Sequence, residues 1–314
     1  MAVAGGGEPA RRGAIAWQAA VEAARSAGTP IVALESSVLA QGLRPPHNRD
    51  AHRLMCGAVL EAGAMPAITA VVAGLATVGI SDETLERFLT SGAPKVSARD
   101  LGWAIGSGRD GATTVAAAIA IAAQAGVDVF ATGGIGGVHR GRSIDESADL
   151  MELSRQSVIT VCAGAKSILD LPATVERLET LGVSVVGYRT DEFPGFFTAR
   201  TGIRLATVAV SAAEIARAFV AGRSLGRAAG VLVVQPPPAN AALDPEAVDA
   251  AVSHALREAD AAGIRGGAVT PFLLAAVERA TGGASVRTNL ALLEANARLA
   301  GEIAVALAAE RVRD

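Results

Sequence analysis

Short apolar runs rich in valine and isoleucine alternate with segments of helical length along most of the chain. The runs predict strands at residues 30–34, 67–73, 127–131, 157–162, 183–187 and 230–234. The intervening segments predict helices at residues 49–62, 82–89, 112–125, 173–181 and 212–221. Strands that are apolar along nearly their whole length and are separated by helices are typical of a parallel sheet buried on both faces. The alternation therefore predicts an α/β fold, an α/β/α sandwich with a mostly parallel central sheet.

From Pro245 onward the pattern changes to almost continuous helix, which ends in a segment over residues 289–311. No internal repeat or linker divides the chain, so we expect a single α/β/α domain over residues 13–314 with a helical C-terminal addition. Residues 1–12 contain Gly5-Gly6-Gly7 and Pro9 and have no apolar run. They do not form a secretion signal, because such a signal needs an apolar segment. We expect them to form a flexible N-terminal arm.

The composition excludes several classes of protein. The chain has 314 residues, of which 51% are hydrophobic and 19% charged, and its formal net charge is −3. This balance differs from that of disordered chains and of strongly basic nucleic-acid binders. Two cysteines, Cys56 and Cys162, cannot build a disulfide framework, and the apolar stretch at residues 112–125 is too short to span a bilayer. We expect a cytoplasmic protein without nucleic-acid or membrane partners.

Lysine is almost absent from the chain. Of its 28 basic residues only Lys95 and Lys166 are lysines, although lysine is ordinarily among the commonest residues. An amine can lose its proton and attack carbon, whereas a guanidinium effectively cannot. The two positions are therefore candidates for sites where arginine cannot substitute. Lys166 is either a nucleophile or a strand-end lysine that reaches solvent; Lys95 either binds a phosphate or carboxylate or is a solvated loop residue.

Polar and glycine-rich residues follow several predicted strands, where the sites of parallel sheets form. Glu35 follows the first strand and is either a general acid or a carboxylate paired with an arginine. Gly133-Gly-Ile-Gly-Gly137 follows the strand at residues 127–131 and lacks the spacing of dinucleotide-binding and P-loop motifs. With His139 and Arg140 it predicts a backbone nest for a phosphate, the alternative being a plain mobile loop.

A cluster of carboxylates lies before a predicted helix, at Asp145-Glu-Ser-Ala-Asp149. Oxygen ligands of this kind suit Mg²⁺ or Mn²⁺. The alternative is helix capping, with Asp145 or Ser147 as the N-cap and acidic residues in the first turn. Cys162 lies in an apolar strand and is interpreted as a small core residue rather than a nucleophile.

Taken together, these segments resemble the pseudouridine-5′-phosphate glycosidase family. The resemblance runs in the same order over about residues 15 to 309, and the glycine and lysine motifs are its most specific parts. The segments that carry it are Ala33-Leu-Glu-Ser36, Gly111-Ala-Thr-Thr-Val115, Phe130-Ala-Thr-Gly-Gly-Ile-Gly-Gly-Val-His-Arg-Gly141, Ser147-Ala-Asp-Leu150, Val161-Cys-Ala-Gly-Ala-Lys-Ser-Ile-Leu-Asp170, Gly187-Tyr188, Glu192-Phe-Pro194 and Thr270-Pro-Phe-Leu273.

The resemblance implies a lyase activity, that of a pseudouridylate synthase. It would reversibly cleave the C–C glycosidic bond of pseudouridine 5′-phosphate to uracil and ribose 5-phosphate, through a Schiff-base-type adduct between a lysine and the ribosyl group. The resemblance also implies one Mn²⁺ per subunit and a homotrimer. Two alternatives stay open: a Schiff-base aldolase acting on a sugar phosphate, and a non-catalytic phosphosugar-binding protein.

Residue roles follow from the resemblance only where positions match the family motifs. Lys166 falls at the nucleophile and Glu35 at the proton donor. Asp145 falls at the metal position. The remaining matches fall at substrate-binding positions: Lys95, Val115, Ser147, Ala148, Asp149, His139 and Asn289. Of these, His139 and Asn289 are expected as further contacts to the phosphate and the base.

The chain departs from the family pattern at four places. Gln41-Gly42-Leu43 stands where a histidine before the glycine and a methionine after it are expected, and Ala98 stands where arginine is expected. Only residues 142–144 separate the glycine loop from Asp145, and Gln235-Pro-Pro-Pro replaces Asn-Pro-x-Pro. The first two changes lie near expected substrate segments and bear on affinity and base selectivity more than on reaction class.

The two lysines are expected to tolerate arginine differently. Lys166→Arg should abolish activity, because a guanidinium cannot form the adduct. Lys95→Arg should retain partial activity, because it keeps the positive charge. The rate of uracil release from pseudouridine 5′-phosphate by each variant measures the difference, and equal losses would mean that the two roles are wrongly divided.

Overall fold

The computed structural model describes residues 15–90, 92–141, 145–265 and 269–311. The arm expected over residues 1–12 lies outside these residues. Among the described helices, each is too short or too polar to serve as a membrane span.

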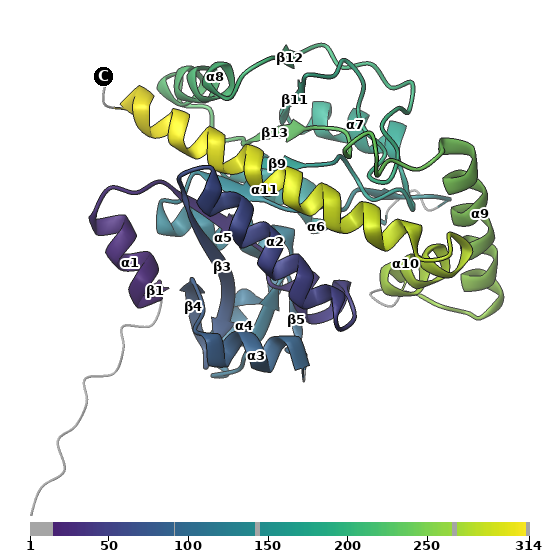
Figure 1. Cartoon of the computed structure of the whole chain (residues 1–314), viewed down its shortest axis with the longest axis horizontal. Helices are drawn as coiled ribbons and strands as arrows, with labels where there is room; N and C mark the ends of the chain where they lie inside the picture. Colours follow the sequence, from purple (N-terminus) through teal and green to yellow (C-terminus); the bar gives the residue numbers. More distant parts are fainter. Residues whose placement is uncertain (1–14, 91, 142–144, 266–268, 312–314) are drawn as a thin grey trace, which may run out of the picture.

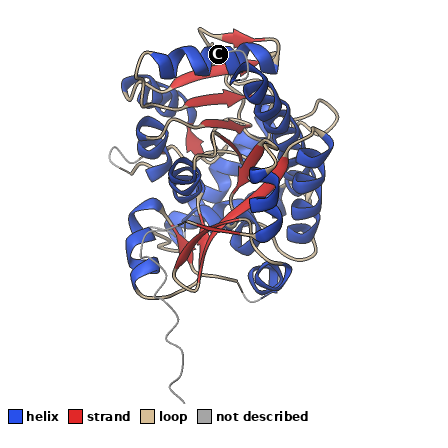
Figure 2. Cartoon of the chain, turned by 90° about the vertical axis from the view of Figure 1, so that its left-hand side faces the viewer, coloured by secondary structure: helices blue, strands red, loops and turns tan. Residues whose placement is uncertain are grey.

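A parallel sheet lies at the centre, between helices on both faces (Figures 1 and 2). Its strands follow the order β3-β2-β7-β9-β13-β11-β12, each parallel to the next. The prediction of a mostly parallel central sheet is therefore confirmed. The strands are β2 (Ile31–Leu34), β3 (Met65–Val72), β7 (Val129–Ala131), β9 (Ile159–Cys162), β11 (Ser184–Tyr188), β12 (Val208–Ala209) and β13 (Val231–Val234).

Beyond β3 the sheet becomes mixed. Two strands, β4 (Leu75–Val78) and β6 (Gly111–Thr113), run antiparallel to β3. β1 (Ala16–Trp17) is parallel to β4, and β5 (Lys95–Val96) is parallel to β6. A separate antiparallel pair, β8 (Val138–His139) and β10 (Leu169–Asp170), joins the glycine loop to the segment after Lys166.

Helices α2, α8 and α11 pack together on one face of the sheet, and α11 crosses β2, β7 and β9 (Figure 1). α5, α6 and α7 lie on the opposite face, while α9 and α10 pack on each other at one end. The helices are α1 (Ala19–Ser26), α2 (His47–Glu61), α3 (Asp82–Thr90), α4 (Leu101–Gly106), α5 (Val115–Ala125), α6 (Ala148–Arg155), α7 (Leu171–Thr180), α8 (Ala212–Ser224), α9 (Pro245–Ala261), α10 (Val269–Ala280) and α11 (Ala284–Arg311).

One predicted helix is wrong at its start. The helix expected over residues 112–125 begins at Val115, because the preceding residues form β6 and Ala112 pairs with Ala70 of β3. Thr114 ends the strand and starts the helix, since its hydroxyl accepts a hydrogen bond from the Ala117 amide at 3.4 Å as the N-cap. The other predicted strands and helices are confirmed with small shifts at their ends.

The connection between β11 and β12 is a loop that packs on the segment carrying Lys166. The amide of Phe196 donates to the Ala163 carbonyl at 3.0 Å, and Phe196 itself has a left-handed φ of 65°. Gly164, with φ 84°, approaches the loop so closely that a Cβ there would collide with the Pro194 carbonyl. Only glycine permits both the conformation and the approach.

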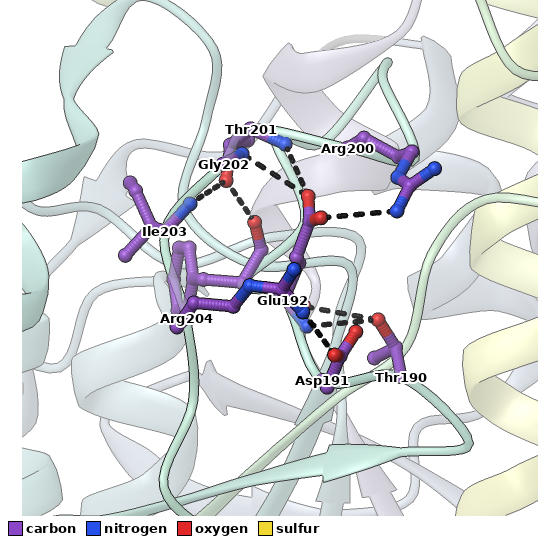
Figure 3. Close-up of polar contacts among 9 residues, drawn as sticks. Thr190, Asp191, Glu192, Arg200, Thr201, Gly202, Ile203 and Arg204 are labelled. Carbon is purple, nitrogen blue, oxygen red and sulfur yellow. Dashed lines mark hydrogen bonds and ion pairs between the residues drawn. The ribbon is translucent and has the colours of Figure 1, made fainter.

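The carboxylate of Glu192 holds this loop closed (Figure 3). It is buried and accepts hydrogen bonds from the amides of Gly202 at 3.1 Å and Thr201 at 3.2 Å, and from the Arg200 guanidinium at 3.2 Å. The Gly202 amide, aided by the Thr201 amide and Arg200, holds the pKa of the Glu192 carboxyl below its usual range.

Glu192→Gln should destabilise the protein at pH 7, where the folded state favours the charged carboxylate. A lowered pKa contributes stability above the ordinary glutamate pKa of about 4.3 and loses it as pH falls through the folded-state value. The free energy of unfolding of the wild type and the variant should therefore converge below about pH 4.3. Denaturant titrations at several pH values measure this convergence.

Arg200→Gln is the matched comparison, because the Arg200 side chain is 76% exposed and its ion pair with Glu192 should contribute little. A larger loss of stability in Arg200→Gln than in Glu192→Gln would contradict the assignment to the backbone amides.

Candidate active site

Three neighbouring strands bring the predicted catalytic residues Glu35 and Lys166, together with Thr132, to one edge of the sheet. Glu35 directly follows β2, Thr132 follows β7, and Lys166 lies four residues beyond β9. β7 pairs with both β2 and β9. Because the carboxyl ends of parallel strands share one edge, segments far apart in sequence meet there. The prediction that a site assembles at these strand ends agrees with this topology.

Glu35 is buried, and both of its carboxylate oxygens accept hydroxyl hydrogen bonds. Ser37 Oγ donates to Oε2 at 2.5 Å, and Thr132 Oγ1 donates to Oε1 at 2.5 Å. No arginine is among these partners, which disfavours the alternative of a strand-end ion pair. The two hydroxyls fix the orientation of this buried carboxyl group.

Three buried hydroxyls lock the backbone around Glu35. Ser36 Oγ donates to the Thr69 carbonyl and accepts from the Thr113 amide, both at 2.8 Å. Thr69 Oγ1 donates to the Leu34 carbonyl at 3.0 Å and contacts Thr113 Oγ1 at 2.9 Å. The network joins the ends of β2 and β6 to the middle of β3. The sequence does not predict it, since isolated serines and threonines carry no periodic signal.

Lys166 is half-buried, and its Nζ donates to the Gly134 carbonyl at 2.8 Å. The backbone before it runs beside the glycine loop, with Ala163 N donating to Gly133 O at 2.9 Å and Ile135 N to Gly164 O at 3.0 Å. The lysine is therefore held against the loop rather than extended into solvent, which favours the functional interpretation over that of a strand-end lysine.

The glycines of the loop are required by close packing. A Cβ at Gly134 would lie 2.5 Å from the Phe196 ring, and one at Gly136 or Gly137 would collide with Ser147 or Thr174. The loop amides do not form an open nest at every position. Ile135 N donates to Gly164 O, and Gly136 N donates to Asp149 at 2.8 Å. The glycines of the loop thus serve close packing as well as any anion contact.

Asp149 is buried and joins the glycine loop to the start of α5. Its Oδ1 accepts from the Ala116 amide at 2.9 Å, and its Oδ2 accepts from the Gly136 amide. Ser147 is the N-cap of α6, and its hydroxyl accepts from the Asp149 amide at 3.2 Å. The capping prediction for Ser147 is confirmed.

The structure brings the predicted substrate residues Val115, Ala148 and Asn289 to the same region. Val115 and Ala148 are the first residues of α5 and α6, which Asp149 and Ser147 hold in place. Asn289 of α11 lies beside the loop, because a Cβ at Gly133 would come within 3.3 Å of Asn289 Oδ1. Lys95 is exposed in β5, where it pairs with Ala112 of the strand that leads into α5.

His139 and Asp145 are adjacent through the backbone, since the His139 amide donates to the Asp145 carbonyl at 2.9 Å. In β8, His139 also pairs with Leu169, which places it near the segment after Lys166.

Arg140, which was expected to add positive charge to a phosphate site, contacts protein groups in this arrangement. Its guanidinium donates to the Leu169 carbonyl at 3.0 Å, to the Ser167 carbonyl at 3.2 Å and to Asp249 of α9 at 2.9 Å. These hydrogen bonds hold the backbone that follows Lys166. Cys162 is fully buried, and burial raises the pKa of its thiol to about 12, so it is a core residue as predicted.

Two residues that sequence reasoning missed complete the site's support. Asn296 of α11 donates to the Thr132 carbonyl at 2.8 Å and accepts from Gln235 Nε2 at 3.0 Å. The departure at Gln235-Pro-Pro-Pro indicates that the segment after β13 differs from the family pattern, but nothing in the sequence links it to Asn296.

The chain has close relatives among characterised families. Residues 20–306 match the family model described as indigoidine synthase A like protein. A pseudouridine-5′-phosphate glycosidase of Gemmatimonas aurantiaca is 64% identical over 281 residues, which are 89% of this chain and 92% of the relative. One from Herpetosiphon aurantiacus is 53% identical over 290 residues, which are 91% of this chain and 96% of the relative.

Two solved structures share the fold. The prealnumycin C-glycosynthase AlnA in complex with ribulose 5-phosphate is 39% identical with a TM-score of 0.89, covering 96% of this chain and 99% of that chain. An indigoidine synthase A-like protein from Thermotoga maritima is 33% identical with a TM-score of 0.87 and the same coverage, 96% and 99%. The chain therefore belongs to the indigoidine synthase A-like, or pseudouridine-5′-phosphate glycosidase, family.

Proposed function

We propose that this protein is a pseudouridine-5′-phosphate glycosidase that reversibly converts pseudouridine 5′-phosphate and water to uracil and ribose 5-phosphate. The observation that carries the proposal is the support of Glu35 and Lys166 by one segment. Thr132 donates to Glu35, and Gly134, two residues later, accepts from Lys166. A proton donor and an amine held at neighbouring strand ends are the two groups that this reaction needs.

The bond to be cleaved joins two carbon atoms, so no heteroatom leaving group can simply be protonated. This determines the kind of mechanism that the enzyme needs. In the proposed reaction the neutral Lys166 amine attacks C1′, the C1′–O4′ bond breaks, and the amine proton passes to O4′. Glu35 then protonates C5 of the uracil ring. The C1′–C5 electron pair restores the C5–C6 double bond while the nitrogen lone pair forms an iminium. Water hydrolyses the iminium, which releases ribose 5-phosphate and returns a proton to Glu35.

The proposal includes a divalent cation, Mn²⁺, at Asp145. Within the described ranges no group of three or more His, Cys, Asp or Glu side chains is arranged to hold a metal ion. Small hard cations commonly use one or two protein carboxylates and complete their shell with water and substrate oxygens. In this proposal Asp145 would hold the cation, and water and substrate oxygens would complete its shell in place of an all-protein cage. When bound, it would supply positive charge beside an anionic substrate.

The proposal also covers assembly and location. Family resemblance supports a homotrimer in the cytoplasm, and light scattering of the purified protein tests the trimer.

A second candidate is C–C bond formation between a sugar phosphate and an acceptor other than uracil. The structural relative AlnA is called a C-glycosynthase and holds ribulose 5-phosphate. The departures at Gln41-Gly42-Leu43 and Ala98 lie near the expected substrate segments and favour testing other bases.

Uracil release across a panel of C- and N-nucleotides tests the proposed function. Pseudouridine 5′-phosphate with Mn²⁺ should release uracil, and chelation should stop the release. Glu35→Gln should lower kcat by about 10²–10⁴-fold, the usual contribution of a general acid. Turnover of sugar phosphates without a nucleobase would favour an aldolase. Ribose 5-phosphate binding without any turnover, unchanged in Glu35→Gln, would favour a binding protein.

Borohydride reduction in the presence of ribose 5-phosphate tests the covalent step. Wild-type protein should gain one ribosyl phosphate adduct on Lys166, read by peptide mass spectrometry, and Lys166→Ala should gain none. An unlabelled wild type, or an equal adduct in Lys166→Ala, would exclude the lysine mechanism.

A further inference from the structure

Asn296 is a polar residue on the buried face of α11, with an exposed fraction of 1%. Its neighbours on that face, Leu292, Leu293 and Ala297, are buried and apolar. An amide in such surroundings is unfavourable unless it is hydrogen-bonded. Its Nδ2 donates to Thr132 O at 2.8 Å and to Gly133 O at 3.3 Å, and its Oδ1 accepts from Gln235 Nε2 at 3.0 Å.

The two carbonyls that Asn296 binds belong to the segment that holds both reacting groups. The side chain of Thr132 donates to Glu35 Oε1. The residue after Gly133 is Gly134, whose carbonyl accepts from Lys166 Nζ. Within the described part of the chain, Asn296 forms hydrogen bonds with Thr132, Gly133 and Gln235 and with neither reacting group, so its contribution acts through the backbone between them.

We propose that Asn296 is a positioning residue, which fixes the backbone of Thr132 and Gly133 and thereby sets the placement of Glu35 and Lys166. The inference rests on the proposed function for its catalytic part. Its structural part, the contribution of this α11 side chain to the order of the backbone at residues 132–136, stands independently. A misplacement of about 1 Å caused by a distant substitution can lower a rate by about 100-fold, so such a residue is important without touching substrate.

Gln235 helps to fix the orientation of the Asn296 side-chain amide. Its side chain follows β13 and donates to Asn296 Oδ1, so Nδ2 must face the two carbonyls. Gln235→Leu removes this donor and leaves Asn296 Oδ1 unpaired, while the two carbonyls still orient Nδ2. Gln235→Glu places an acceptor against Oδ1, which favours the turned amide and brings Oδ1 against the carbonyls of Thr132 and Gly133. Gln235, which departs from the family pattern, thus helps to position the loop backbone through Asn296.

The first experiment compares Asn296→Leu with Leu307→Ala. Leu307 is buried on the same helix, away from the glycine loop, and its truncation lowers stability by leaving a cavity. We expect Asn296→Leu to speed amide hydrogen exchange in the peptide covering residues 132–136 and to lower kcat by about 10- to 100-fold with a smaller change in KM. Leu307→Ala should lower the Tm but change neither the exchange of this peptide nor kcat.

A fall in kcat that follows Tm equally in both variants would overturn the proposal, because Asn296 would then only stabilise the core. The Gln235 pair keeps the test decisive if Asn296→Leu does not fold. Gln235→Glu should speed exchange at residues 132–136 and lower kcat more than Gln235→Leu does. Equal effects of the two substitutions would overturn the directional role.

Hydrogen exchange needs no substrate, so the proposal and the proposed function can fail separately. A wild type that releases no uracil would exclude the glycosidase assignment, while the exchange data would still decide whether Asn296 orders the loop. Unchanged exchange in Asn296→Leu, with uracil release by the wild type intact, would overturn the positioning role alone.

Discussion

The site depends on one constraint: backbone that is buried beyond the ends of strands must still find hydrogen-bond partners. β2, β7 and β9 end within the fold, and the chain after each of them stays buried without a regular ladder. Side chains supply the missing partners. Ser36 bonds to backbone groups of β3 and β6, Asp149 accepts from two amides, and Asn296 donates to two carbonyls. The placement of the reacting groups follows from these bonds.

Asp149 and Asn296 come from different parts of the chain and act on opposite sides of the glycine loop. Asp149 holds the loop at Gly136 from α6, on one face of the sheet, and Asn296 holds it at Thr132 from α11, on the other. Phe196 packs against Gly134 between them. A loop whose glycine content suggests mobility is therefore fixed along its length, and its glycines serve the close approach of its neighbours.

Much of this arrangement could be predicted from sequence. Sites of parallel sheets form at the carboxyl ends of the strands, and buried strands leave a strong signal in the sequence. Buried strands are visible as apolar runs, so the polar residues after them, Glu35 and Lys166, could be assigned to one edge of a sheet before any coordinates. Ser147 was predictable as an N-cap for a similar local reason.

The rest depends on tertiary contacts that leave no local pattern. Asn296 is one of several polar residues in α11, and Thr69 and Thr113 are single threonines in apolar strands. β6 was predicted as helix because its alanine continues an alanine-rich run, although pairing with β3 decides its conformation. The charge of Arg140 next to the glycines indicates a phosphate contact, but the sequence does not show that its guanidinium also donates to the carbonyls of Ser167 and Leu169 after Lys166.

The crossing of α11 over β2, β7 and β9 has a consequence for how the protein acquires its activity. Thr132 is 97 residues from Glu35 and 164 residues from Asn296, so the reacting groups are set by contacts between distant parts of the chain. Contacts that close such long loops form slowly, because chain entropy opposes them until the partners are in place. A folding chain can therefore build its sheet before α11 docks, and catalytic competence is among the last properties it gains.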